Sequence, residues 1–498
     1  MSTPRPVSAP IAVLMFSLAA WSATGCTTGT RYVRPVDPTQ TQYLPPAAAH
    51  PAGVAAVAAP HVTMGNGPPQ RWWTLLGSAD IDALVMRALQ NNQSLAAAKA
   101  HLAAAREHLR AASGAWYPQV DAVAGAQRTR FGAPVLGPLA KDFPPFSAYA
   151  AGVGVSYDFD IFGGTKSRVE QASAVAQYRS AQLDAVALSV SGNVVIQAVQ
   201  IASLRAQIQV AEQIVADDEH TLGLIRAARE AGAVSAMDVL SAQSQLDHDR
   251  TLLPPLQQDL SAARDTLTVL IGAAPSDGTA TDVALDALTL TDEVPLAVPS
   301  ELVRRRPDIS AAEAQLHAAS ATVGVATANL YPNFTLTASL GRAGLLGGGP
   351  SETAWNLLGG LTAPIFHGGA LKAERRAAQD EYQAAFAAYQ QTVLNAFGQV
   401  AAALQAIGND ADFLNAQQRA LDSAGASTAL TQQAYAAGNA GYLQVLDAER
   451  LHQQAQLGRV QAAGQRYVDV VKLILAAGGR TDIPADDASG ISDRRGNP

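Results

Sequence analysis

The feature that most constrains the fold of this 498-residue chain is an internal duplication, because a repeated segment implies a repeated architecture. Three segments recur in the same order at a nearly constant separation. The matched segments are 92–118 with 306–332, 160–172 with 364–378, and 231–243 with 437–449. In the second pair, DIFGGTKSRVEQA corresponds to PIFHGGALKAERRAA, which carries one extra residue at His367. The chain is therefore expected to contain two related copies of one unit.

Each copy is expected to form a helix, a β segment, a very long helix, a tight turn and a second long helix. The proline-free stretch Lys166–Ala231 would extend over about 100 Å as one helix, which favours a coiled coil or a helical tube over a compact core. Gly232 and Gly438 lie where the long helices must reverse, a position that suits the left-handed backbone conformation. Pro254-Pro255 predicts a kink in the returning helix of the first copy alone.

The β segments are recognised by strict alternation of residue types. From Ala150 to Ile161 every second residue is apolar, whereas those between are small or acidic, and 334–341 and 355–365 alternate in the same way. Two strands per copy give four per chain, which is too few to close a barrel. Three chains would supply twelve strands, an even number that an outer-membrane barrel requires.

Two acids in the first β segment could bind a metal, act as acid and base, or line a channel. Asp158 and Asp160 lie two residues apart and are expected on one face of the strand. The second copy has Thr362 and Pro364 at these positions, so chemistry that needs both carboxylates is not expected. We expect the two acids to face the lumen of a barrel.

The N-terminus has the pattern of a secretory signal: a charged Arg5, the apolar run Ile11–Trp21, then small residues. Cys26 follows directly and is the only cysteine, which excludes a disulfide within the chain. The stretch 23–26, Ala-Thr-Gly-Cys, is similar to a bacterial lipobox, although Ala23 replaces the usual leucine. Cys26 is therefore expected to carry lipid; the alternative is an unused thiol in a discarded leader.

No motif in the sequence predicts an enzyme, a cofactor or a metal. The nine histidines lack HExxH or other zinc spacing, and neither a Walker A sequence nor a GxSxG elbow occurs. The net charge of −8, with no basic cluster larger than Arg304–Arg306, argues against a nucleic-acid partner. The acids Asp217-Asp218 and Asp247/Asp249 are expected on helix surfaces.

Two further features have simple structural interpretations. Arg304–Asp308 could bind a phosphate or a partner, but Pro307 and Asp308 favour a helix start. No uninterrupted apolar run reaches eighteen residues, which argues against a membrane-spanning helix but leaves a β-barrel open.

Taken together, these segments resemble the TolC-type outer-membrane efflux proteins, in particular the NodT-like lipoprotein branch, over about residues 30–480. The motifs that carry the resemblance are RRRPDISAAEAQLHAA at 304–319, LYPNFTLTASLG at 330–341, the FGG and FHGG turns and the two tips with glycine followed by Val-Leu. The resemblance implies a mainly α fold with membrane β-strands: a homotrimer with a 12-stranded β-barrel, an α-helical barrel of duplicated hairpins and a mixed α/β equatorial region. The expected divisions are a signal peptide 1–25, an N-terminal arm 26–75, repeat one 76–290, repeat two 291–480 and a disordered tail 481–498.

By the same resemblance, the chain would be the passive exit duct of a tripartite efflux system in the outer membrane, anchored by lipid and extending into the periplasm. Its implied partners are a periplasmic adaptor protein and a proton-driven inner-membrane pump that exports small molecules or drugs. The alternatives are a duct for type I protein secretion and, from another class, a soluble periplasmic coiled-coil scaffold.

The resemblance also implies roles for individual residues. Leu443, Asp447 and Arg450 match the periplasmic aperture, where Gln444 replaces an acid found in some members. The hairpin tips at Gly232 and Gly438 would contact the adaptor. The turns from barrel to helix would be formed by Gly163, Gly164, Gly368 and Gly369.

Overall fold

The computed structural model describes most of the chain. The described residues are 32–36, 42–44, 61–65, 67–130, 144–277, 282–290, 293–348, 350–479 and 481. They fall into two compact units: a strand unit with residues 103–178, 312–389 and those up to Arg34, and a helix unit with residues 35–102, 179–311 and from Gln390 onward. The expected signal peptide, Cys26 and nearly all of the expected C-terminal tail lie outside the described residues.

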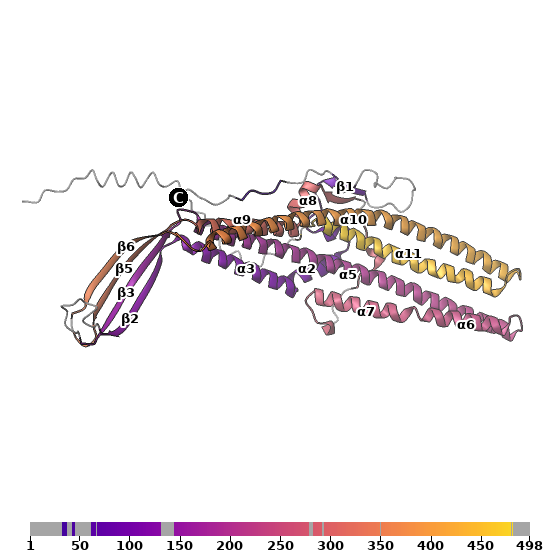
Figure 1. Ribbon diagram of the computed structural model, residues 1–498. Helices are drawn as coiled ribbons and strands as arrows, with labels where there is room; N and C mark the ends of the chain where they lie inside the picture. Colours follow the sequence, from indigo (N-terminus) through magenta and orange to yellow (C-terminus); the bar gives the residue numbers. More distant parts are fainter. Residues whose placement is uncertain are drawn as a thin grey trace, which may run out of the picture. The chain divides into compact units, whose positions relative to one another are not determined.

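The strand unit contains one antiparallel sheet of four strands, which lie side by side in Figure 1 in the order β2-β3-β5-β6. The strands are β2 (Gln119–Thr129), β3 (Phe146–Phe159), β5 (Asn333–Leu345) and β6 (Glu352–Thr362). The central pair, β3 and β5, joins the two copies of the duplication, and Gly152 pairs with Gly341. A Cβ on either glycine would lie 2.7 Å from a carbonyl oxygen of the other strand, so both positions require glycine. The expectation of two strands per copy is confirmed.

In the described part of the chain, β2 and β6 form the two edges of this sheet and pair with one strand each. Every residue of β6 is exposed, including Trp355, Leu357 and Leu361, as are Val120 and Val123 of β2. Exposed strand edges with apolar side chains are sites for pairing with further strands. The sheet of one chain therefore offers edges for the strands of other chains, which agrees with the prediction that four strands are too few to close a barrel.

Two helices of equal length dominate the chain: α5 (Gly164–Glu230) and α10 (Ala370–Ala436), each of 67 residues. Each returns through a second helical segment. In the first copy this segment is α6 (Ala236–Arg250) followed by α7 (Leu253–Leu270), and in the second it is α11 (Tyr442–Ala476). We call α5–α6–α7 hairpin one and α10–α11 hairpin two (Figure 1). The predicted long helices are confirmed.

The effect of Pro254-Pro255 is larger than the predicted kink. Hairpin one breaks at Thr251-Leu252, and both prolines lie in the first turn of a new helix, α7. Proline is tolerated in a first turn because the amide there has no helical acceptor. α11 continues without a break, so the predicted asymmetry between the copies is confirmed.

Shorter elements complete the helix unit. They are β1 (His61–Gly65), η2 (Trp72–Leu76), α2 (Ala79–Asn91), η4 (Pro275–Asp277), η5 (Leu285–Ala287), β4 (Glu293–Ala297) and α8 (Pro299–Arg305). β1 and β4 form a two-stranded parallel sheet that joins the N-terminal segment to the linker between the copies, and the sequence did not predict these strands. Trp72, Trp73 and Leu76 of η2 are fully buried. The helices α3 (Gln93–Ser113), with η3 (Gly114–Trp116), and α9 (Pro307–Ala328) lead into the strands of each copy.

One described helix, α5, contains an 18-residue window with a mean hydropathy of 1.6, apolar enough by composition to cross a membrane. More than half of the window, 56%, is buried in the structure. Val194, Val195 and Val199 of this helix are almost completely buried in the helix unit. The composition of α5 thus fits a helix that is covered by other helices.

Candidate functional site

The two hairpin tips are closed in the same way. Gly232 has a φ of +76° and Gly438 a φ of +75°, as expected for a residue that ends a helix in the left-handed conformation. Ala233 donates a backbone hydrogen bond of 2.9 Å to Ala228, and Asn439 one of 2.8 Å to Ala434. Both tips are therefore helix ends whose last carbonyl groups accept backbone hydrogen bonds.

The helix starts after the tips differ. Ser235 caps α6 through a capping box in which its hydroxyl accepts from the Asp238 amide at 3.2 Å and the Asp238 carboxylate accepts from the Ser235 amide at 2.8 Å. At the start of α11 only half of this arrangement exists. The Gln444 side chain accepts from the Gly441 amide at 3.1 Å, and Gly441 has no side chain to return the bond.

A hydrophobic cluster near the tips joins the two hairpins. Its buried members come from α5, α6 and α11: Leu222, Ile225, Ala242, Leu246, Tyr442 and Val445. Tyr435 and Leu446 of hairpin two pack against it from the rim. Separation of the hairpins at this end would expose these side chains to water, so the cluster opposes such movement.

The predicted aperture residues lie on an exposed face of α11. Leu443 is 58% exposed, and the Asp447 and Arg450 side chains are 62% and 61% exposed. Arg450 donates to Asp447 at 2.6 Å within the same helix. Arg450 also lines a groove with Met237, Leu240 and His248 of α6, among other residues.

The prediction that the acidic pairs lie on helix surfaces is wrong for one member of each. Asp218 of α5 is 7% exposed and Asp249 of α6 is 5% exposed, whereas Asp217 and Asp247 are exposed. Burial, followed by the hydrogen bond and negative charge of Asp249, raises the pKa of Asp218 to about 8. Burial also raises the pKa of Glu449 on α11. Residues one apart on a helix point about 100° apart and residues two apart about 200°, which places one acid of each pair inside and the other outside.

A second pair of facing acids, Asp410 and Asp469, joins α10 to α11 in hairpin two. Burial and the neighbouring Asp469 raise the pKa of Asp410 to about 6. Burial acts to raise the pKa of Asp469, but hydrogen bonds from Lys472 and Gln465, each 2.8 Å, outweigh it and lower the pKa. This pair therefore has a cation beside it.

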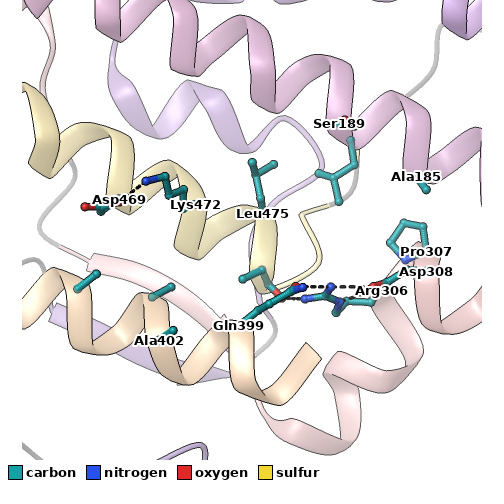
Figure 2. A pocket seen from close by; sticks show the side chains of 14 residues that line it. Ala185, Ser189, Arg306, Pro307, Asp308, Gln399, Ala402, Asp469, Lys472 and Leu475 are labelled. Carbon is teal, nitrogen blue, oxygen red and sulfur yellow. Dashed lines mark hydrogen bonds and ion pairs between the residues drawn. The ribbon is translucent and has the colours of Figure 1, made fainter. Parts of the chain in front are cut away.

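Asp469 and Lys472 line a cavity of about 730 Å³ whose other lining residues come from α5, α10, α11, Arg306 and the start of α9 (Figure 2). Arg306, 7% exposed, donates to the Asp308 carboxylate, to the Ala476 carbonyl at 2.9 Å and to Gln399 at 2.7 Å. Asp308 also accepts from the Ile309 amide at 2.9 Å. α9 begins at Pro307, so the predicted helix start is confirmed, and Arg306 is held by groups of the chain itself.

The predicted turns between strands and long helices are formed by glycines with positive φ: Gly163 at +79°, Gly368 at +58° and Gly369 at +85°. Gly164 is the first residue of α5, and a Cβ there would lie 3.2 Å from Ala328. Any further role of these four glycines stays a prediction.

The prediction that Asp160 lies on a strand face with Asp158 is wrong. β3 ends at Phe159, and the Asp160 carboxylate accepts from the amides of Thr165 at 2.9 Å and Lys166 at 2.7 Å. Asp160 therefore caps the N-terminus of α5. Asp158 is a residue of β3 and pairs with Thr335.

Among the residues that the structure describes, no group of three or more histidine, cysteine, aspartate or glutamate side chains is arranged to hold a metal ion. The lipidation predicted at Cys26 falls outside these residues.

An open sheet with lipid-compatible strands, followed by paired hairpins far longer than a compact core requires, defines a channel-forming protein of the outer-membrane type. Comparison with known proteins gives the particular family. The family described as "Outer membrane efflux protein" matches residues 84–273 and 298–479, and the chain belongs to it. The chain is accordingly the outer-membrane channel of a tripartite efflux pump, is not an enzyme, and extends into the periplasm.

Individual relatives agree with this assignment. The chain is 32% identical over 416 residues to the pyoverdine export outer membrane protein OpmQ of Pseudomonas aeruginosa, covering 82% of this chain and 87% of the relative. It is 29% identical over 478 residues to the toluene efflux pump outer membrane protein TtgC of Pseudomonas putida, covering 94% and 95%.

Among solved structures, the outer-membrane channel OprN is 27% identical with a TM-score of 0.83, covering 91% of this chain and 99% of that one. The open state of the MtrE outer membrane channel of Neisseria gonorrhoeae is 25% identical with a TM-score of 0.74, covering 91% and 98%. As an outer-membrane component of an efflux pump, the chain works with an adaptor and an inner-membrane pump, and the family assembles as trimers.

Proposed function

We propose that this channel is a passive duct for small molecules and that it is gated at the tip of hairpin two. The observation that supports this gate is the exposed face of α11 that carries Leu443 and Asp447. These side chains are four residues apart and therefore lie one above the other on the same face. Within the described residues both side chains are exposed, which suits a face turned toward a threefold axis.

In a trimer, three copies of Asp447 would form a ring of carboxylates with a ring of Leu443 one turn away. Like charges held close repel one another, and the Arg450 guanidinium at 2.6 Å offsets part of this repulsion. A movement of hairpin two over residues 411–475 would widen both rings. Because Gln444 is neutral, this region of α11 supplies a single acidic ring.

Single-channel conductance of the purified trimer in planar bilayers tests the gate. We expect Asp447→Ala, alone or combined with Arg450→Ala, to increase the conductance of the closed channel several-fold. The matched control is Asp422→Ala, which removes an exposed acid of α10 that accepts from Gln418 in its own helix. Unchanged conductance in both Asp447 variants would show that the gate lies elsewhere.

The exported molecules are proposed to be of the size of siderophores, antibiotics and solvents. Relatives are named for export of pyoverdine and efflux of toluene and antibiotics, which share no common charge or shape. A duct that serves such different molecules leaves selection to its pump, which we propose is proton-driven, and receives its adaptor at the tips near Gly232 and Gly438. Susceptibility of a deletion strain to a panel of these compounds tests the substrate class. Loss of secretion of a large protein with unchanged susceptibility would instead support the type I secretion alternative.

The N-terminal anchor is also a proposal. The lipobox-like stretch before Cys26 supports acylation of this residue after cleavage. Mass spectrometry of the mature protein should show the added acyl mass, and Cys26→Ser should remove it. An unmodified N-terminal peptide that includes or lacks Cys26 would contradict the anchor.

A further inference from the structure

The buried acids Asp218 and Asp249 connect the two helices of hairpin one close to its tip. Asp218 precedes Gly232 by 14 residues, which corresponds to about 21 Å along α5. Both side chains are more than nine-tenths buried. A buried carboxylate without a cation is costly, so the way in which these two are accommodated needs a physical explanation.

The hydrogen bonds of the pair are incomplete unless a proton is present. One oxygen of Asp218, Oδ1, accepts from Gln453 of α11 at 3.1 Å, and Oδ2 of Asp249 accepts from Gln245 at 2.7 Å. The second oxygen of Asp218, Oδ2, is buried and has no hydrogen-bond donor in the described part of the chain. Two ionised carboxylates have no hydrogen to share, whereas a carboxylic acid donates to a carboxylate. A proton between Asp218 and Asp249 would satisfy the remaining oxygen.

The surroundings favour that proton. The groups that act most strongly on Asp218 are Asp249 of α6 and Gln453 and Glu449 of α11, and none of them is a cation. Tyr442 of α11 is also close enough to interact with Asp218. The nearest arginine of α6, Arg250, is exposed and bonded to Glu219 at 2.7 Å. Burial therefore raises the pKa of Asp218 into the range where one proton is retained at neutral pH.

The second copy shows that the fold does not depend on these acids. The positions that correspond to Asp218 and Asp249 are Ala424 and Ala455, and Ala455 is buried between its helices. An equivalent hairpin thus packs with small apolar side chains at the same height. Acids that the scaffold can replace by alanine, yet bury in hairpin one, point to a role other than packing.

We propose that one proton shared by Asp218 and Asp249 forms a latch that holds α5 and α6 of hairpin one together. Loss of the proton leaves two buried negative charges, which repel each other and loosen α5 against α6, beside the hydrophobic cluster that both helices share with α11. The consequence for channel opening rests on the proposed movement of hairpin two, whereas the shared proton itself does not.

The direction of the pH effect follows from linkage. In the closed state the pair keeps a proton up to about pH 8, and a separated, hydrated Asp218 would release it near the ordinary aspartate value. Opening therefore releases a proton between these values. The equilibrium constant that favours the closed contact between α5 and α6 is largest at acidic pH. It falls by as much as about tenfold per pH unit as the pH rises toward 8, and it is constant above that value.

Infrared difference spectra of the full-length trimer, recorded between pH 6 and pH 9, test for the proton. We expect a carboxylic acid carbonyl band that disappears as the pH rises through about 8, distinct from any band of Asp410, whose pKa is about 6. This band should be lost in Asp218→Asn and should titrate at lower pH in Asp249→Asn, where burial still acts on Asp218 but the charge of Asp249 is gone. The exposed neighbours supply matched controls, since Asp217→Asn and Asp247→Asn should retain the band. Absence of the band in the wild type, or its persistence in Asp218→Asn, would overturn the proposal.

Hydrogen exchange measured by mass spectrometry tests the latch. The intrinsic exchange rate of each amide divided by its measured rate gives a protection factor, which removes the pH dependence of the exchange chemistry. In the wild type, the protection factors of residues 210–230 and 236–252 should fall as the pH rises from 6 to 8. The double variant Asp218→Ala/Asp249→Ala carries the residues of the second copy, should fold, and should show no such pH dependence. Equal pH dependence in this variant and the wild type would refute the latch. If the infrared band and the exchange behave as expected but the conductance does not change with pH, the result contradicts the proposed gate and still supports the shared proton.

Discussion

Hairpins one and two start from the same design and differ in how their helices return. The outgoing helices both have 67 residues and both end at a glycine with positive φ. The returning segment is broken at Thr251-Leu252 in hairpin one, whereas α11 runs for 35 residues without interruption. The two copies therefore share the length of the outgoing helix and the glycine turn, which together set the position of each tip. The returning helices differ.

The acid pairs show the same divergence in chemical terms. The pair Asp218–Asp249 has no cation among the groups that act most strongly on Asp218, whereas the pair Asp410–Asp469 has Lys472 at 2.8 Å from Asp469. The pKa of Asp410 is raised only to about 6, so this pair is ionised at neutral pH and balanced by lysine. A pair of facing aspartates thus holds a proton in hairpin one, whereas in hairpin two a different pair is ionised and bonded to a lysine.

The largest expected effect comes from transferring the break of hairpin one to hairpin two. Val460 of α11 corresponds to Pro254. Val460→Pro should remove a helical hydrogen bond and clash with the preceding turn, which costs about 3 kcal/mol or more. Thermal unfolding of the purified trimer measures this loss. The control Pro254→Ala should change stability by less than about 1 kcal/mol, because the proline lies in a first turn. Equal effects would mean that the break has no structural significance.

An intermediate effect is expected from removing the cation that distinguishes the two acid pairs. Lys472 is 54% exposed, so Lys472→Met should cost only about 1 kcal/mol at pH 7. Without the lysine the pKa of Asp410 should rise above 6, and the loss should diminish below pH 6, where the pair takes up a proton. Unfolding at pH 5 and pH 7 measures the difference. The exposed Lys372 of α10 supplies the control, and a Lys472→Met loss independent of pH would contradict this account.

The smallest expected effect concerns the caps. Gly441→Ser would give α11 the complete capping box that Ser235 gives α6, and a Cβ at Gly441 meets no atom within 4 Å. Serine exceeds glycine at this position by only a few tenths of a kcal/mol, so we expect a small stabilisation. Denaturant unfolding measures the free energy of unfolding of Gly441→Ser and of Ser235→Ala. The second variant loses a serine cap and should be less stable than the wild type by about 1 kcal/mol. A destabilised Gly441→Ser would show that the tip needs glycine for another reason.

Local and periodic features could be predicted from the sequence. The 67-residue helices, the glycine turns and the alternating strands follow from the proline-free alanine-rich stretch after Lys166, from Gly232 and Gly438, and from period two after Ala150. Asp160 was misplaced because it lies one residue beyond the end of β3, and strand ends are set by neighbouring backbone rather than by the pattern.

Burial on the long helices could not be predicted in the same way. α5 is rich in alanine on all sides, so its sequence has no clear apolar stripe to show that Asp218 faces inward and Asp217 outward. The inner side is decided by where α6 and α11 pack. The assignment of Leu443, Asp447 and Arg450 to an aperture rests on resemblance and stays a proposal, since a face that meets other chains looks like an ordinary exposed face in one chain.

The pairing of β1 with β4 has a consequence for the order of folding. Val62 pairs with Val294, so the two strands are separated by more than a third of the chain. Contacts between residues so far apart form slowly, and an unpaired strand in the meantime is prone to wrong association. We therefore expect the N-terminal strand to join the linker late, after the helices of the first copy have formed.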